Sequence, residues 1–133
     1  MRKLRVYLAG YHKDLKYREI VKDYCLDCLE LVDPMEFTYK EVVDDIGENC
    51  VHNYIVRHDK MLIDTCHIVV ANIRNGPTFG TVMEIQYSFN KGIPVFVIDP
   101  TPGFKYGSDP WCKFHTTKLF SSIGECFDYI MNK

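Results

Sequence analysis

Two carboxylates and one tyrosine are the residues of this chain best suited to chemistry. Glu84 lies inside an apolar segment that reads as a helix, Asp59 lies in the preceding predicted helix, and Tyr7 lies near the end of the first predicted strand. Because a buried carboxylate without a partner is costly, Glu84 either faces water or has a task. Two carboxylates that face one pocket suit cleavage of a glycosidic bond: one attacks or stabilises the anomeric carbon, and the other moves a proton at the leaving group. A tyrosine hydroxyl can hold the attacking carboxylate in one rotamer.

The same three residues also have ordinary structural interpretations. Asp59 is consistent with a solvated helix position, Glu84 with a carboxylate on a helix surface, and Tyr7 with a core tyrosine. Residue type and position leave both interpretations open.

Composition excludes several classes of function. The chain has 133 residues, 26% charged residues and a net charge of -2, without a run of Lys or Arg, so a nucleic-acid polymer is not an expected partner. Its first apolar run is too short for a signal peptide or a membrane span, which predicts a cytoplasmic protein without a membrane partner. The sequence lacks G-x-G-x-x-G, G-x-S-x-G and a P-loop lysine.

The cysteines and histidines do not predict a metal site or another cofactor. Six cysteines are present, and one pair, Cys25 and Cys28, forms C-x-x-C, but this pair falls within a predicted helix and no second pair follows with zinc-like spacing. Small buried apolar positions are the simplest interpretation of the cysteines. The five histidines are scattered along the chain.

Alternating strands and helices predict a single α/β domain over residues 1–133. We expect a flavodoxin-like or Rossmann-like three-layer sandwich around a mostly parallel sheet of about five strands. The predicted helices span residues 15–31, 51–66, 79–90 and 123–132, and the predicted strands span residues 4–9, 35–40, 67–73, 93–98 and 117–122. Residues 99–111 read as a loop rich in Pro and Gly.

The carboxyl ends of the strands form the expected binding rim. In open α/β sheets, ligands bind beyond these ends. The rim would carry Gly10 and Tyr11 after the first strand, Asn72 at the end of the middle strand, and Asp99. The turn before the Glu84 helix lies on the same rim, with Thr78 as the expected N-cap.

Three segments together resemble the nucleoside 2-deoxyribosyltransferase family. They are "VYLAGY", "RHDKMLIDTCHIVVANI" and "GPTFGTVMEIQYSFNKGIPVFV", and the resemblance covers about residues 4–98. The family also contains the 2'-deoxynucleoside 5'-monophosphate N-glycosidases. The resemblance implies that Glu84 is the nucleophile at C1', that Asp59 contacts the sugar or assists proton transfer at the base, and that Tyr7 orients the nucleophile.

The resemblance also implies substrate-binding positions. Gly10 and Tyr11 match the loop that closes over the sugar or the 5' end. Gly80 matches a small residue that allows close approach at the helix start. Asn72 is placed among the binding residues by its position on the rim.

Two departures from the family pattern bear on function. His67 stands where an aspartate is expected, at a support position. Thr78 stands where transferases tend to have an aspartate and the nucleotide-cleaving branch tends to have a serine that touches the 5'-phosphate. A hydroxyl at a helix N-terminus is a ready phosphate site, and His12 and Lys13 in the first loop would add positive charge.

The expected activity is cleavage of the N-glycosidic bond of a 2'-deoxynucleoside with transfer of the deoxyribosyl group to another nucleobase. Hydrolysis of a deoxynucleotide is the alternative that Thr78 favours, and a nucleotide-binding module without turnover is a third hypothesis. No metal or organic cofactor is implied. The family resemblance implies a homodimer or higher homo-oligomer, for which Trp111, Phe114 and Phe120 are candidate contacts, unless they pack the last helix onto the sheet.

Overall fold

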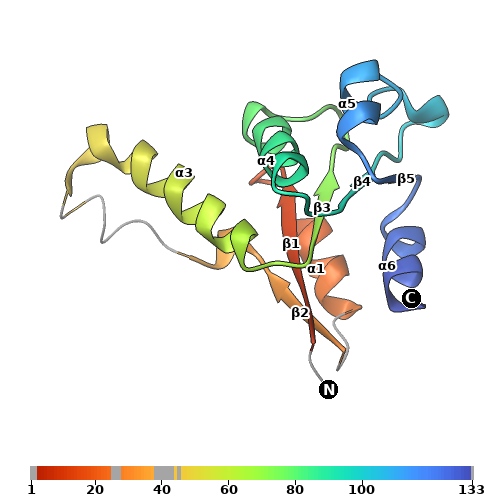
Figure 1. Cartoon of the computed structure of the whole chain (residues 1–133), viewed down its shortest axis with the longest axis horizontal. Coiled ribbons are helices and arrows are strands. Elements are labelled where there is room, and N and C mark those ends of the chain that lie inside the picture. The colour runs from red at the N-terminus through yellow and green to blue at the C-terminus, as the bar shows by residue number, and fades with distance from the viewer. Residues whose placement is uncertain (1–2, 25–27, 38–43, 45, 133) are drawn as a thin grey trace.

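The computed structural model describes residues 3–24, 28–37, 44 and 46–132, which form a five-stranded sheet with helices on both faces (Figure 1). Every pair of neighbouring strands is parallel. Across the sheet, the order is β2 (Leu29–Val32), β1 (Leu4–Gly10), β3 (Ile68–Asn72), β4 (Val95–Ile98) and β5 (Lys118–Phe120). This 2-1-3-4-5 order is the flavodoxin-like one, so the predicted fold class is confirmed.

Alternate residues of β1 point into two separate apolar cores. Val6 and Leu8 pack toward α1 (Leu15–Asp23) and α6 (Ile123–Met131). Tyr7 and Ala9 pack on the opposite face, toward the C-terminal end of α3 (Glu48–Asp64) and α4 (Phe79–Asn90). The strands β3 and β4 are short apolar runs buried on both faces, as expected for a parallel sheet covered on two sides.

The Glu84 helix has the predicted bounds, but its surroundings differ from the prediction. Thr78 is the N-cap of α4, and its hydroxyl accepts a hydrogen bond from the Thr81 N–H. The apolar composition predicted a helix pressed against the sheet, yet α4 leaves one apolar face in solvent. Phe79 is 89% exposed and Met83 is 65% exposed.

The predicted helix over residues 15–31 is wrong in its second half. The helix α1 ends at Asp23, and residues 29–32 form the edge strand β2 instead. Leu29 to Val32 pair in register with Leu4 to Tyr7 of β1, and this tertiary pairing prevails over helical periodicity.

The strand predicted at residues 35–40 is also wrong over its described part. Pro34–Glu36 is a short 3-10 helix, η1, capped by the Asp33 carboxylate, which accepts a hydrogen bond from the Met35 N–H. Residues 38–40 lie outside the described residues.

The predicted loop over residues 99–111 contains a 3-10 helix, η2 (Pro102–Phe104), and leads into a short helix, α5 (Pro110–His115). The start of α5 has ordinary local signals that the prediction missed. Asp109 caps the helix through the Trp111 N–H, and Pro110 occupies the first turn.

The cysteines are only partly the buried apolar residues that were predicted. Cys66 and Cys126 are buried and Cys112 is half-buried, whereas Cys28 and Cys50 are exposed. Cys25 lies outside the described residues, and with it the predicted C-x-x-C pair.

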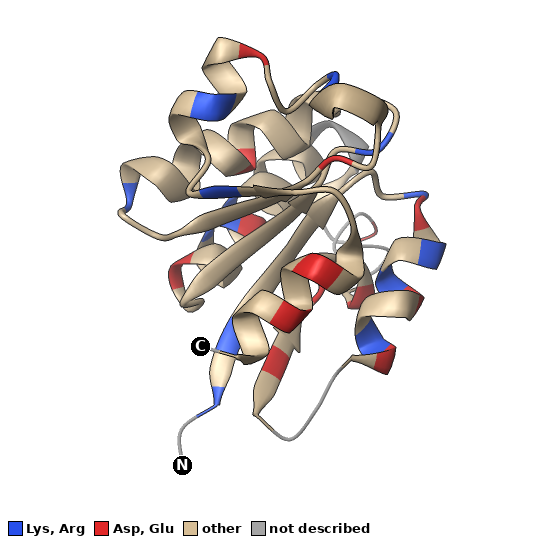
Figure 2. Ribbon diagram, turned by 90° about the vertical axis from the view of Figure 1, so that its right-hand side faces the viewer, with Lys and Arg blue, Asp and Glu red and all other residues tan. Residues whose placement is uncertain are grey.

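Charged residues of both signs are spread over several helices and strands (Figure 2). Within the described part of the chain, no helix is long and apolar enough to cross a membrane.

Candidate functional site

The predicted nucleophile and its predicted orienting tyrosine are in contact. Tyr7 is fully buried in β1, and its hydroxyl donates a short hydrogen bond to Oε2 of Glu84. Glu84 is half-buried in α4, one residue before the buried Ile85. The odd-numbered side chains of β1 face α4, and this alternation brings a strand residue and a helix residue far apart in sequence to one point.

The environment of Glu84 raises its pKa, so the protonated form persists to a higher pH than for an ordinary glutamate. Burial raises the pKa of Glu84 to about 7, the Tyr7 hydrogen bond acts to lower it, the charge of Asp59 raises it, and the charge of Arg18 lowers it. Asp59 is half-buried in α3, close enough for its charge to act on Glu84. A partly buried carboxyl group that titrates near neutral pH beside a second carboxylate is typical of functional sites.

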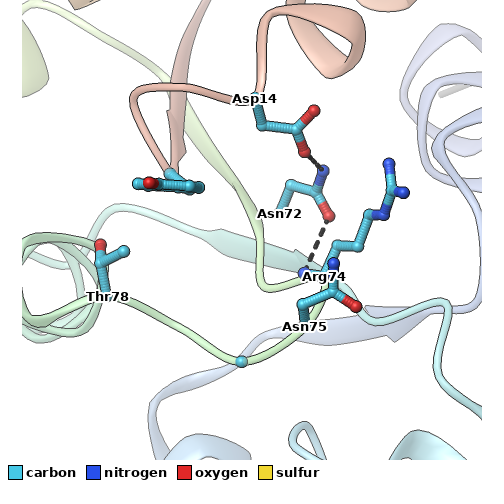
Figure 3. A pocket seen from close by; sticks show the side chains of 7 residues that line it. Asp14, Asn72, Arg74, Asn75 and Thr78 are labelled. Atoms are coloured by element: carbon cyan, nitrogen blue, oxygen red, sulfur yellow. Dashed lines mark hydrogen bonds between the residues drawn. The ribbon is translucent and has the colours of Figure 1, made fainter.

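A polar cleft of about 440 Å³ opens at the carboxyl edge of the sheet. It lies where the strand order reverses, between the loops that follow β1 and β3, which is where ligands bind in such sheets. Figure 3 shows its side chains, and the residues that line it are Tyr11, Asp14, Asn72, Arg74, Asn75, Gly76 and Thr78.

A short hydrogen-bond chain orders the floor of this cleft (Figure 3). Asn72 is 7% exposed; its Nδ2 donates to Oδ2 of Asp14 at 3.3 Å, and its Oδ1 accepts from the Arg74 N–H at 3.2 Å. Asp14 also caps α1 by accepting from the Tyr17 N–H. The loops after β1 and β3 are therefore tied together at the cleft.

Thr78 joins the cleft to the Glu84 helix. It lines the cleft, and its hydroxyl lies 2.9 Å from that of Thr81, which is buried. Thr78 caps the Thr81 N–H, whereas the N–H groups of Phe79 and Gly80 have no acceptor within the helix, so this end of α4 can receive an anion.

The other predicted binding residues are distributed unevenly. Tyr11 lines the cleft and is 43% exposed, while His12 is exposed beside the Tyr11 ring and lies outside the lining. Gly10 has a packing role, because a Cβ there would lie 3.2 Å from the Tyr17 ring and 3.3 Å from the Asn72 carbonyl oxygen. Gly80 is exposed at the start of α4, and a Cβ there would meet nothing within 4 Å.

Sequence reasoning missed a buried ion pair at the same edge. Arg18 Nε donates to Oδ1 of Asp33 at 2.9 Å, and Nη1 donates to the Tyr11 carbonyl oxygen at 3.0 Å. Arg74 and Asp14 in the cleft were missed as well. With β2 placed correctly, Asp33 would have stood at the end of a strand and joined the predicted rim, whereas no local signal singles out Arg18 within its helix.

No group of three or more His, Cys, Asp or Glu side chains in the described part of the chain is placed to hold a metal ion.

Solved structures of other proteins share this fold over almost the whole chain. A 2-deoxyribosyltransferase from Bacillus psychrosaccharolyticus has a TM-score of 0.73 at 18% identity, over 97% of this chain and 91% of that chain. A conserved protein from Enterococcus faecalis V583 has a TM-score of 0.74 at 19% identity, over 98% of this chain and 99% of that chain. A 2-deoxyribosyltransferase from Leishmania mexicana has a TM-score of 0.60 at 16% identity, over 97% of each chain.

No protein-family model matches the sequence, and no curated protein matches it. The solved structures nevertheless confirm the resemblance at the level of three-dimensional structure: the chain has the fold of the 2-deoxyribosyltransferases.

Proposed function

We propose that the protein cleaves the N-glycosidic bond of 2'-deoxynucleosides and transfers the deoxyribosyl group to another nucleobase, with Glu84 as the nucleophile. One observation carries the proposal: in a chain with the 2-deoxyribosyltransferase fold, Tyr7 is hydrogen-bonded to Glu84, and Glu84 belongs to the helix whose N-cap, Thr78, lines the rim cleft. The raised pKa of Glu84, about 7, marks it as a candidate functional group, and the carboxylate that attacks C1' forms as the pH rises through this value.

The proposed reaction has two displacements at C1'. A Glu84 oxygen attacks C1', the bond from C1' to the base nitrogen breaks, and its electron pair leaves with the base. Asp59 contacts the sugar or assists proton transfer at the departing base. A nitrogen of the second base then attacks C1' and loses its proton to the carboxylate of Asp59, while the ester bond to Glu84 breaks and its electron pair restores the Glu84 carboxylate. Tyr7 holds the carboxylate in the attacking rotamer before the first displacement.

The cleft supports a binding role for the 5' end of the substrate. Thr78 precedes Glu84 by nearly two helical turns, a rise of about 9 Å, which a sugar with a 5' substituent can span when it is contacted at both ends. We assign Gly10 and Tyr11, at the end of β1, and Asn72, at the end of β3, to the walls of the binding site. His12 and Gly80 would act from the mouth of the site.

A second candidate is hydrolysis of 2'-deoxynucleoside 5'-monophosphates, in which water replaces the second base. Thr78 favours it, because its hydroxyl lies at the open start of α4, and the exposed Arg74 lines the same cleft. A phosphate there would gain hydrogen bonds from the helix and charge from Arg74. The remaining alternative is a nucleotide-binding module without turnover.

A chromatographic assay separates the three candidates. Purified protein is incubated with deoxynucleosides and with their monophosphates, each with and without a second free base. A new nucleoside that forms only with the acceptor base supports transfer, and free base released from monophosphates without an acceptor supports hydrolysis. Glu84→Ala should lower either rate about a thousandfold or more. Binding without product in every mixture would reject both enzyme candidates.

We also infer that the chain forms a homodimer or a higher homo-oligomer through its exposed apolar face. This face, formed by α4 and α5, comprises Phe79, Val82, Met83, Phe89, Trp111 and Phe114. A group of exposed large apolar side chains on two neighbouring helices is typical of interaction surfaces. Phe120 does not belong to it, because it is 5% exposed and packs against Phe96 and Tyr129 in the core.

A further inference from the structure

Arg18 is an unusual residue to find buried in α1. Only 3% of it is exposed, and its partner Asp33 is 2% exposed. Its guanidinium group lies at the carboxyl edge of the sheet, where it donates to Asp33 after β2 and to the Tyr11 carbonyl oxygen after β1. Arg18 therefore connects three segments that meet at the binding rim: the start of α1, the loop after β1 and the end of β2.

We propose that Arg18 is a positioning residue of the site: its buried guanidinium group holds the Tyr11 loop in place and sets a positive charge at the sheet edge, beside the end of the strand that pairs with Tyr7. The inference rests on the proposed function of Glu84 as a nucleophile. It deepens that function by assigning a control of the nucleophile to a residue outside the cleft.

The geometry explains why an ion pair is placed here. Tyr7 pairs in register with Val32, so Asp33 follows directly after the strand residue beside Tyr7. Arg18 reaches this point from α1, which covers the face of the sheet opposite to α4. Its charge thus approaches the pair formed by Tyr7 and Glu84 from across the sheet edge.

Stability alone is a poor reason for this arrangement. Burying two charges costs several kcal/mol in desolvation, and an apolar pair of similar volume is often as stable or more stable. A guanidinium group can donate to a carboxylate and to a carbonyl oxygen from one fixed fork, which a lysine cannot reproduce. The structure uses that fork to fix the loop of Tyr11, the residue that lines the cleft.

The charges around Glu84 come from three elements. Tyr7 of β1 donates a hydrogen bond, Asp59 of α3 contributes a negative charge, and Arg18 of α1 contributes a positive one. Burial and Asp59 both favour the protonated carboxyl, while Tyr7 and Arg18 favour the carboxylate. Burial is the largest of these influences on the pKa, and the Arg18 charge partly offsets the charge of Asp59.

The test is a carbon-13 NMR titration of the Glu84 carboxyl, assigned with Glu84→Gln, in the wild type and in variants. Arg18→Met should move the midpoint of Glu84 upward by roughly half a pH unit or more. The double variant Arg18→Met with Asp33→Asn should show the same shift without an unpaired buried carboxylate, so it serves if the single variant does not fold. Arg18→Lys keeps the charge and should leave the midpoint at the wild-type value.

Lys22→Met is the matched control. Lys22 also faces Asp33, at 3.6 Å, but it is 44% exposed and is not among the groups that shift the pKa of Glu84. Its removal should leave the titration unchanged. An unmoved midpoint in both the Arg18→Met and the double variant, or an equal shift in Lys22→Met, would overturn the role of the Arg18 charge.

Steady-state kinetics tests the positioning role. Arg18→Lys should raise KM several-fold and leave kcat within about twofold, because the Tyr11 carbonyl loses its donor while Glu84 keeps the charge. Wild-type KM in Arg18→Lys would contradict the positioning role. If the wild type showed no turnover, the proposed function would fail, whereas the titration would still decide the charge of Arg18 independently.

Discussion

At Glu84, folding and the proposed chemistry favour different protonation states. The pKa of Glu84 is raised from 4.5 to about 7 by burial, so the folded protein binds this proton more tightly than the unfolded chain does. The contribution of Glu84 to stability is therefore greatest below pH 4.5 and is lost as pH rises through about 7. Attack at C1' requires the carboxylate, which forms only where this contribution has been lost.

The first prediction concerns Glu84→Gln, which removes the charge and keeps an oxygen that can accept from Tyr7. At pH 8, the variant should be more stable than the wild type by up to about 3 kcal/mol, while activity is abolished. Below pH 4.5, the difference should vanish. Urea unfolding at several pH values measures it, and a variant less stable than the wild type at pH 8 would contradict the raised pKa.

The second prediction concerns Tyr7→Phe. A hydrogen bond to a charged group contributes about 1.5–3 kcal/mol, so its loss should lower kcat about tenfold to a hundredfold. Because the Tyr7 hydrogen bond lowers the pKa of Glu84, the acidic limb of the pH–rate profile should move to higher pH in the variant. Tyr17→Phe is the control, since this buried hydroxyl donates to the Val70 carbonyl oxygen, at 3.4 Å, and should leave the profile unchanged when it is removed.

At the scale of elements, hydrogen bonds at the amino-terminal edge of the sheet explain how His67 can stand where the resemblance leads us to expect an aspartate. His67 precedes β3, and its Nδ1 accepts the Arg5 backbone N–H at 2.9 Å, while the His67 N–H donates to the Arg5 carbonyl oxygen. The side chain thus extends the pairing of β1 and β3 by one hydrogen bond. An aspartate oxygen can accept the same N–H, which accounts for the exchange of one residue for the other.

The third prediction follows from this hydrogen bond. His67→Asp should leave the free energy of unfolding within about 0.5 kcal/mol of the wild type, whereas His67→Ala should lose about 1 kcal/mol. Urea unfolding at pH 7.5 distinguishes the two variants. Equal losses in both would show that the acceptor at this position does not matter.

The loop after β4 is organised by one carboxylate. Asp99 is fully buried and accepts the N–H groups of Thr101, Tyr106 and Gly107 at 3.0, 2.9 and 2.8 Å. Burial acts to raise the pKa of Asp99, but these hydrogen bonds outweigh it and lower the pKa. The Tyr106 ring lies beside Gly76 of the cleft, where an added Cβ would be 3.4 Å away.

The fourth prediction is that Asp99→Ala destabilises the protein by about 3 kcal/mol, because three N–H groups, one buried and two partly buried, lose their acceptor. Amide hydrogen exchange should accelerate at Tyr106 and Gly107. The control Asp109→Ala removes the N-cap of the short helix α5 and should cost only about 1 kcal/mol. Similar losses in the two variants would contradict the organising role of Asp99.

In the wild type, the contribution of Asp99 to stability should be lost as pH falls below 3.8 and through the lowered pKa of Asp99.

At the scale of the whole molecule, the exposed apolar face of α4 and α5 lies on one side of the sheet. Phe89 of α4 and Phe114 of α5 have ring centroids 5.2 Å apart, so the two helices form one continuous surface. A second cleft of about 390 Å³, lined in part by Val82 and Trp111, opens between them. Together these features provide the surface through which we propose that copies of the chain associate.

The fifth prediction is that Met83→Glu shifts the protein to monomers in sedimentation analysis, because a charge at the centre of an apolar interface is costly. Met61→Glu is the matched control: Met61 is also 65% exposed, but it lies on α3, away from this face. A monomeric wild type, or an oligomer that survives Met83→Glu, would reject this face as the interface.

Local signals were sufficient for much of the architecture. The bounds of α4 follow from Thr78 as an N-cap and Gly92 after its end, and the apolar runs of β3 and β4 follow from their burial on both faces. Residue type and order along the chain also marked Tyr7 and Glu84, because a carboxylate in an apolar helix requires a partner. The structure brings these two side chains together, while their catalytic roles remain predictions.

What only the tertiary structure decided depends on contacts between distant segments. β2 forms at residues 29–32 because β1 offers a partner strand, and the ion pair of Arg18 and Asp33 exists because α1 begins at the rim where β2 ends. The exposed face of α4 likewise depends on which neighbours cover it. A sequence states the spacing of residues within one helix or strand, but burial, charge pairing and the pKa of Glu84 arise from the way in which those elements are packed together.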